Sequence, residues 1–245
     1  WSGTGPANRP GPMNEALTLL SFGPNGWGDE IAYGVFVTIS LAVATLPLGL
    51  LLGFLIALAK QSPERSLRAA ADIYTTIFRG LPELLTLFLV YYGVPILLNQ
   101  MVRIFNPEAS LDVNSFVAGM VALAVVFSSY ASEAFLSAFR GIRQGQYEGG
   151  FALGLNRSQT MRLIILPQLI RLALPALGNL WLILLKDTAL VSIVGLNDLL
   201  RWTGVAARVE KEPFLFYGLA CLIYLALAIV SSVGLSRIER WSGRG

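Results

Sequence analysis

Long stretches without an ionisable side chain constrain the fold of this 245-residue chain most strongly. A helix needs about 20 consecutive apolar residues to cross a hydrocarbon layer of about 30 Å. Four stretches are close to this length and contain no ionisable residue. A fifth is interrupted only by Arg171 and ends at Lys186 and Asp187. The sequence therefore predicts an all-α integral membrane protein with five transmembrane helices, at residues 31–59, 84–102, 113–132, 167–185 and 214–236.

The composition supports a membrane protein over a soluble one. Hydrophobic side chains make up 55% of the chain and charged ones 13%, whereas charged residues are roughly a quarter of a typical soluble domain. The formal net charge of +3 is what loops rich in Lys and Arg give to a membrane protein. We therefore expect membrane lipid, and no nucleic acid, as a partner.

The distribution of basic residues predicts the orientation of the chain. Cytoplasmic loops of membrane proteins carry an excess of Lys and Arg. With the N-terminus outside, twelve of the 18 basic residues fall on the inner side: Lys60, Arg65, Arg68, Arg79, Arg140, Arg143, Arg157, Arg162, Arg171, Arg237, Arg240 and Arg244. The prediction is an outer N-terminus and an inner C-terminus, although Lys186, Arg201, Arg208 and Lys211 cluster in one outer loop.

This topology divides the chain into an external segment (residues 1–30), a membrane domain (31–240) and a cytoplasmic tail (241–245). Residues 1–12 are rich in Gly and Pro, and Met13 resembles a natural start, so we expect the first dozen residues to be foreign or to follow from a misassigned start. The inner loop of residues 60–83 mixes arginines with apolar residues and predicts a short amphipathic helix lying at the membrane interface. Gly49 and Gly53 have the GxxxG spacing of closely packed helices.

Several chemistries are excluded by missing residues. The chain has no histidine, and its one cysteine, Cys221, falls in the last apolar stretch, where we expect it to pack. The three lysines follow Ala59, Leu185 and Glu210, so the chain lacks the glycine-lysine loop that holds nucleotide phosphates. We expect no enzyme activity, metal or cofactor in this chain itself.

Residues 139–167 form the most informative inner segment, with four arginines and Glu148. Residues 146–153 predict about two turns of helix, and Gly154 suits the left-handed position that ends a helix. Ser158 is expected to cap a second short helix, and Pro167 fits the first turn of the next span. The segment therefore predicts two short helices folded at Gly154 and projecting into the cytosol.

This segment resembles the EAA loop of bacterial ABC importer permeases. Its residues EGG at 148–150 are followed by Gly154 and then by IILP at 164–167, with the spacing of that motif. Three further motifs, RGLPELL at 79–85, YASEAF at 130–135 and LKDTAL at 185–190, resemble the polar amino-acid group of these permeases, which includes the histidine, arginine and opine systems.

The resemblance implies a type I importer that moves polar or basic amino acids, or opine-like derivatives, into the cell by alternating access. Its partners would be a second permease subunit, identical or homologous, an external solute-binding protein, and two ATPase subunits that bind ATP and Mg. No internal repeat is visible in the sequence, so a pore with two-fold pseudosymmetry needs a second chain. The chain would reside in the bacterial inner membrane.

The same resemblance assigns ATPase coupling to the loop residues Glu148, Gly149, Gly150, Gly154, Ile164, Leu166 and Pro167. Gly149 and Gly150 replace the two alanines of the motif, and each glycine costs about 0.8 to 1 kcal/mol of helix propensity. Gly150→Ala is therefore expected to be tolerated or mildly stabilising. Gly154→Val is expected to uncouple ATP hydrolysis from transport, because a β-branched residue does not easily adopt a positive φ.

Five residues are candidates for the substrate pathway: Glu83, Glu133, Lys186, Asp187 and Thr188. The adjacent charges of Lys186 and Asp187 suit a zwitterionic substrate, and the short apolar run after them predicts that the chain folds back there. Structural alternatives exist for each charge. Glu133 would pair with Arg140 or Arg143, Glu83 would be the last charge before the bilayer, and Lys186 would extend to the interface while Asp187 caps its helix.

Two other function classes would require different features in the sequence. A secondary transporter or channel would show intramembrane carboxylate relays or an inverted repeat, and an intramembrane enzyme would need a nucleophile and a base within the spans. The sequence shows neither pattern. It also leaves open which amino acid is carried and whether this chain or its partner holds the substrate pocket.

Overall fold

The computed structural model describes residues 12–106 and 113–242, and within these ranges the chain is helical without strands. Its elements are α1 (Pro12–Leu19), α2 (Gly28–Lys60), α3 (Arg65–Gly80), α4 (Glu83–Phe105), α5 (Ser115–Gly141), α6 (Gln144–Ala152), α7 (Arg157–Thr160), η1 (Met161–Ile165), α8 (Leu166–Asp187), η2 (Thr188–Ser192), α9 (Leu199–Glu210) and α10 (Pro213–Ser242). Residues 1–11, which are all but one of the dozen expected to be foreign or to follow from a misassigned start, lie outside the described part.

The five predicted spans are confirmed as helices long and apolar enough to cross a membrane: α2, α4, α5, the continuous unit from α7 to η2, and α10. The fourth span is longer than expected. It begins at Arg157 rather than near Pro167, because η1 is a π-helical segment that joins α7 to α8 without a break. The second short helix is therefore the end of the span and not a separate element.

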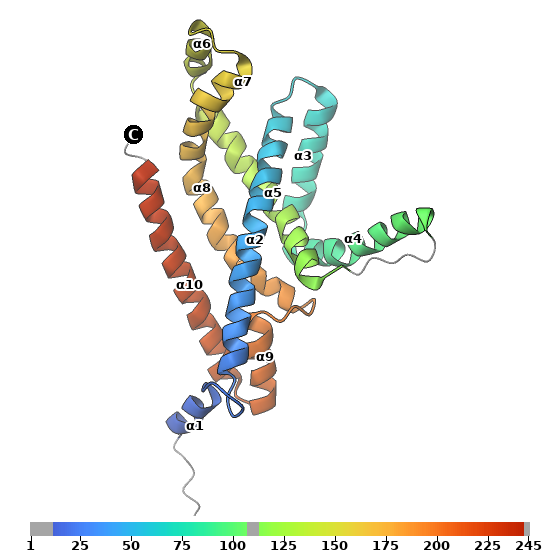
Figure 1. Ribbon diagram of the computed structural model, residues 1–245, viewed down its shortest axis with the longest axis vertical. Helices are drawn as coiled ribbons and strands as arrows, with labels where there is room; N and C mark the ends of the chain where they lie inside the picture. Colours follow the sequence, from blue (N-terminus) through green and yellow to red (C-terminus); the bar gives the residue numbers. More distant parts are fainter. Residues whose placement is uncertain (1–11, 107–112, 243–245) are drawn as a thin grey trace, which may run out of the picture.

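The core lies where α2 and α5 cross and where α8 packs against α5 (Figure 1). Small residues on α2 allow the close approach that the GxxxG spacing predicted. A Cβ atom at Gly53 would lie 2.8 Å from the Cβ of Ala131, and one at Gly49 would lie 2.5 Å from the Phe127 ring. These contacts bring the backbones of α2 and α5 together over the middle of both helices.

Helix α4 projects sideways from the bundle, at a steep angle to α2 (Figure 1). Only its first half packs, through the buried residues Thr86, Leu87 and Val90. Beyond the internal Pro95, large apolar side chains such as Ile104 and Phe105 are exposed. The apolar surface of α4 is therefore available to lipid or to other protein.

Two expectations about side-chain and helix placement are corrected. Helix α3 was expected to lie at the membrane interface, but it runs beside the C-terminal half of α2, a membrane span, and also contacts α5 (Figure 1). The polar contact between the Tyr74 hydroxyl and the Val125 carbonyl, at 3.0 Å, holds it there. Cys221 is exposed on α10 rather than packed inside.

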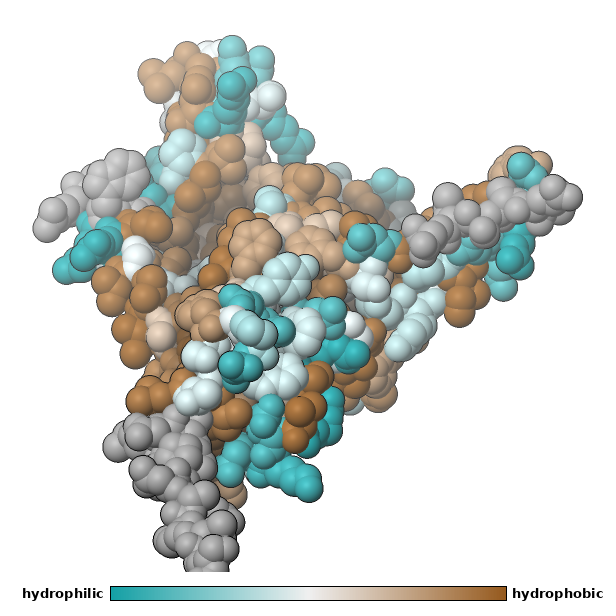
Figure 2. Space-filling view, turned by 60° about the horizontal axis from the view of Figure 1, so that its bottom comes forward, coloured by the Kyte–Doolittle hydropathy of each residue, from teal (hydrophilic) through white to brown (hydrophobic). Residues whose placement is uncertain are grey.

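The two ends of the bundle differ in their elements. Helices α6 and α7 and the end of α10 lie at one end, which we call the loop end, and α1 and α9 lie at the other, the α9 end (Figure 1). Figure 2 shows hydrophilic and near-neutral residues gathered on the α9 end, with hydrophobic residues along the flanks. This distribution is what a protein with both ends in water and its flanks in lipid requires.

Candidate functional site

The turn between α6 and α7 is a Schellman motif centred on Gly154. The N–H of Leu155 donates to the carbonyl of Gly150 at 3.1 Å, and the N–H of Gly154 donates to that of Phe151 at 2.9 Å. This pattern requires a left-handed residue after the helix, and Gly154 has φ +78°. The predicted fold at Gly154 is confirmed.

The cap of α7 is Asn156 and not the predicted Ser158. The Asn156 side chain accepts from the N–H of Gln159 at 2.9 Å, and the Gln159 side chain accepts from the N–H of Asn156 at 2.9 Å. This reciprocal pair is a capping box. The spacing Asn-x-x-Gln at residues 156–159 is the sequence pattern that indicates this capping box.

The two glycines of α6 have opposite environments. A Cβ at Gly149 would meet nothing within 4 Å, whereas one at Gly150 would lie 2.5 Å from Cγ2 of Thr160 and 3.2 Å from Ile164. The expectation that Gly150→Ala is tolerated is therefore wrong, because α6 packs on the first turns of the fourth span at that position. The hydrogen bond from Gln168 to Gln146, at 3.0 Å, adds a second contact between α6 and the fourth span.

The remaining loop residues divide into an exposed tip and a packed base. Glu148 is exposed, and so are the large apolar side chains of Phe151 and Leu153. Ile164 and Leu166 pack against the main core, and Pro167 lies in the first turn of α8. The loop thus presents one carboxylate and two apolar side chains at its tip on a base fixed to the span.

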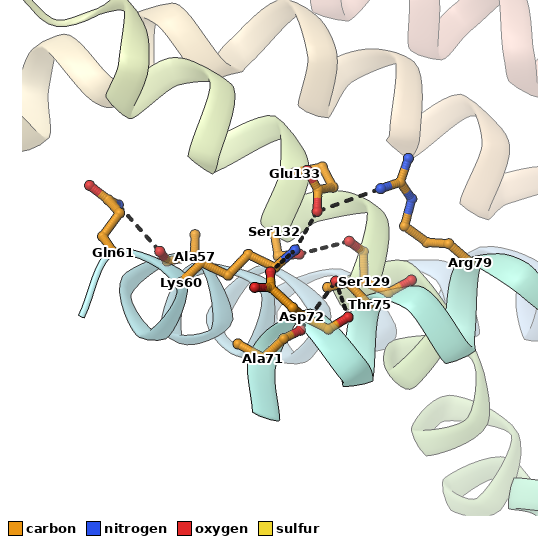
Figure 3. A network of polar contacts seen from close by, with 10 residues as sticks. All are labelled: Ala57, Lys60, Gln61, Ala71, Asp72, Thr75, Arg79, Ser129, Ser132 and Glu133. Carbon is orange, nitrogen blue, oxygen red and sulfur yellow. Dashed lines mark hydrogen bonds and ion pairs between the residues drawn. The ribbon is translucent and has the colours of Figure 1, made fainter. Parts of the chain in front are cut away.

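Glu133 lies in a network of charges that joins α2, α3 and α5 (Figure 3). The Nζ atom of Lys60 is 2.5 Å from Oε1 of Glu133 and 3.3 Å from Oδ1 of Asp72, and Nη1 of Arg79 is 3.5 Å from Oε1 of Glu133. Glu133 therefore pairs with Lys60 and Arg79, and not with Arg140 or Arg143, the partners in the structural alternative. The side chain of Lys60 is only 7% exposed, and the two carboxylates offset the cost of burying its ammonium group.

Three of the sequence motifs converge on one cavity between α4, α5 and α8. Glu83 of the first motif, Tyr130 of the second and Asp187 of the third all line it, together with apolar residues such as Leu87 and Phe127. The cavity offers about 20 Å³ to the centre of a water molecule, which is room for about one water. The conformation is closed to a solute as large as an amino acid.

The other pathway candidates lie outside this cavity. Lys186 is exposed, away from the lining that Asp187 joins. Thr188 is buried, and its hydroxyl donates to the Leu185 carbonyl at 2.7 Å. The Arg79 guanidinium lies 5.7 Å from the centre of the Tyr130 ring, so Tyr130 connects the cavity with the Glu133 network. The sequence reasoning did not single out Tyr130.

The chain after Asp187 folds back through η2 and a turn at Gly195, which has φ +98°. Helix α9, which was not predicted, follows with Asp198 as its cap: the carboxylate accepts from the N–H of Arg201 at 2.9 Å. Burial raises the pKa of Asp198 to about 6, and the hydrogen bond from Arg201 opposes the shift. A cap residue before an amphipathic stretch was the available signal.

Residues 47–240 match the family described as "Binding-protein-dependent transport system inner membrane component". The chain belongs to this family. It is 40% identical to the nopaline transport system permease protein NocQ of Agrobacterium fabrum over 94% of this chain and 98% of that one. It is 38% identical to the arginine ABC transporter permease protein ArtQ of Haemophilus influenzae, over 83% of this chain and 89% of that one.

Solved structures agree with the family. A crystal structure of an amino acid ABC transporter with histidines superposes with a TM-score of 0.74 at 32% identity, covering 87% of this chain and 94% of that chain. An inward-facing structure of the MetNI methionine ABC transporter gives 0.67 at 17% identity, over 86% and 95%, and supports the fold alone. This family member is thus a membrane component of an importer that works with further subunits.

Proposed function

We propose that this chain carries basic amino acids, or opine-type derivatives of them, across the bacterial inner membrane by alternating access. The observation that carries the proposal is the convergence of Glu83, Tyr130 and Asp187 on one cavity. Two carboxylates and an aromatic ring suit a cationic side chain, which attracts both negative charge and the face of a ring. The similarity to nopaline and arginine permeases supports the same class of substrate.

The closed cavity requires a second conformation for transport. A solute can enter only if α4 and α8 separate from α5, because the three helices supply its walls. Helix α4 has few buried residues beyond its first half, so it can move without disrupting the core. The charges of Glu83 and Asp187 would then be open to the substrate.

The energy for this movement comes, in our proposal, from two ATPase subunits bound to the residue 139–167 loop. The exposed tip with Glu148, Phe151 and Leu153 would contact the ATPase. Since α7, η1 and α8 form one continuous helix, a shift of the tip would be transmitted along the fourth span. ATP and Mg would be bound by the ATPase subunits, and the pore would be completed by a second permease subunit, with an external solute-binding protein delivering the substrate.

The proposed orientation places residues 1–30 outside, the membrane domain at 31–240, and the tail at 241–245 inside. It is supported by the twelve basic residues assigned to the inner side. A membrane-impermeant thiol reagent applied to intact cells should label Asn106→Cys and spare Ser158→Cys, in a Cys221→Ser background. Labelling of Ser158→Cys alone would reverse the orientation.

Uptake by the reconstituted transporter, with the binding protein present, tests the substrate site. Asp187→Asn and Glu83→Gln should each raise the arginine concentration needed for half-maximal uptake by about tenfold or more, because an ion pair to the substrate is lost. Lys186→Met should change it less than twofold, since Lys186 lies outside the cavity. Equal effects of all three substitutions would refute the cavity as the site.

A further inference from the structure

A groove of about 840 Å³ lies between the α2–α3 turn and the loop that carries α6 and α7. One side is formed by Leu55, Leu58 and Leu67 and the other by Phe151 and Met161. It is separate from the cavity with Glu83 and Asp187, and it shares only Phe151 with the loop tip that is proposed to contact the ATPase.

The apolar wall of the groove continues the flank of α2 that would face lipid. Leu51 and Leu55 are 57% and 51% exposed, on successive turns of α2. Leu55 also lines the groove, and Leu58 continues the wall toward the end of α2. A hydrocarbon chain lying along α2 would therefore enter the groove without crossing polar surface.

The lining of the groove also has a polar and positively charged part. Gln61, Ser62 and Arg157 line it, and Arg157 is exposed and makes no ion pair with any residue that the structure describes. Arg65 and Arg68 are exposed on the first turn of α3, the helix that carries the lining residue Leu67.

Two carboxylates lie on the same segment of chain. Asp72 pairs with Lys60, and Glu64 accepts from the Ser66 hydroxyl at 2.7 Å and keeps its negative charge. Arg65, Arg68 and Arg157 outnumber Glu64, so the excess charge near the groove is positive.

We propose that this groove binds one molecule of an anionic glycerophospholipid, with its acyl chains against the leucines of α2 and its phosphate at Arg157. Basic pockets beside membrane helices select anionic headgroups because the charge attraction is added to acyl-chain burial. The lipid would bridge α2 and the 139–167 loop, so the lipid composition would influence how the loop moves. The inference rests on the membrane placement in the proposed function and not on the substrate.

Native mass spectrometry of the assembled transporter, released from micelles doped with phosphatidylglycerol or phosphatidylcholine, tests this proposal. The wild type should retain phosphatidylglycerol in preference to phosphatidylcholine. Arg157→Gln should reduce that retention by about fivefold, the effect of one basic residue near a lipid surface. The matched control is Arg162→Gln, an exposed arginine on the same continuous helix that does not line the groove, and it should change retention less than twofold.

A second variant separates the groove from the charge. Ser62→Trp fills the groove while Arg157 remains, and it should also lose the bound lipid. Any of four results would overturn the proposal. Two concern the variants: equal losses of lipid in both arginine variants, or full retention in Ser62→Trp. The other two concern the wild type: displacement of the lipid by millimolar inorganic phosphate, or retention of the lipid only before the ATPase assembles. Arginine uptake by the wild type in phosphatidylcholine alone checks the transport function independently.

Discussion

The two ends of the bundle are held together in different ways. At the loop end, α2, α3 and α5 are joined by charged side chains, of which Asp72 is 59% and Arg79 45% exposed. At the α9 end, the backbones themselves meet: a Cβ at Gly34 would lie 2.8 Å from the Cα of Leu199. The N–H of Leu199 also donates to the Thr38 hydroxyl at 3.2 Å.

This difference bears on which end can move. Close-packed backbones have no space to shift without losing contacts, whereas partly exposed ion pairs exchange partners with water at small cost. We infer that the α9 end is the rigid end of the molecule and that the loop end rearranges during transport.

The largest effect is expected for Gly34→Val. The added side chain would overlap the backbone at Leu199 and force α9 away from α2, and overpacking of this kind costs about 1–3 kcal/mol or more. Thermal unfolding of the purified protein in micelles should show the loss. The control is Gly218→Val on α10, where a Cβ would meet nothing within 4 Å, and it should change stability little. An equal loss of stability in both variants would contradict a specific role for the contact between Gly34 and Leu199.

The second pair compares the adjacent glycines of α6. Gly150→Ala should detach α6 from Thr160, lower the protease resistance of the loop and reduce uptake several-fold, since the overlap with Thr160 cannot be avoided without moving one helix. Gly149→Ala should strengthen α6 by up to about 1 kcal/mol, because helix propensity rises and no contact is disturbed. Limited proteolysis of both variants would measure the contrast, and similar digestion rates would contradict it.

The third test concerns the charged network. Glu133→Gln removes both ion pairs of Glu133 and leaves Lys60, only 7% exposed, with Asp72 alone. We expect a stability loss of about 1–2 kcal/mol in denaturant titrations, and Asp72→Asn should cost less than about 0.5 kcal/mol because Asp72 is mostly exposed. Should Asp72→Asn prove the more damaging, the main partner of Lys60 would be Asp72.

The smallest effect is a pH dependence at the α9 end. Burial raises the pKa of Asp198 from 3.8 to about 6, so folding favours the protonated carboxyl. The contribution of Asp198 to the free energy of unfolding is complete below pH 3.8 and is lost as the pH rises through 6. The free energy of unfolding should therefore increase by about 1 kcal/mol from pH 7 to pH 5. Asp198→Asn, which keeps the cap, should remove this part of the pH dependence from the unfolding midpoint; an unchanged pH profile would assign it to other groups.

The sequence predicted the spans and the turn at Gly154 because both depend on local rules. Charge-free length determines whether a helix can span a bilayer, and a left-handed helix end strongly favours glycine. What it missed depends on contacts between distant segments. The overlap of Gly150 with Thr160 and the pairing of Glu133 with Lys60 and Arg79 appear only once the helices are packed.

The path of α3 and the continuity of α7 with α8 were missed for related reasons. An amphipathic pattern fits a helix on the membrane surface and one beside other helices equally well, and the Tyr74 contact that decides between them joins α3 to α5. The π-helical turn of η1 satisfies the backbone through a segment where Pro167 predicted a helix start. Helix α9 has a clear cap at Asp198, but its apolar content is too low for a membrane span.

We propose that the loop folded at Gly154 couples ATP hydrolysis to movement of the spans. Gly154 suits a direct test because a Cβ there would meet nothing within 4 Å, so a substitution acts only through the positive φ. In proteoliposomes containing the ATPase and the binding protein, uptake per ATP hydrolysed should fall at least tenfold in Gly154→Val and recover in Gly154→Asn, since asparagine tolerates this conformation. A Gly154→Val transporter that assembles normally and keeps the wild-type ratio of uptake to hydrolysis would contradict the claim.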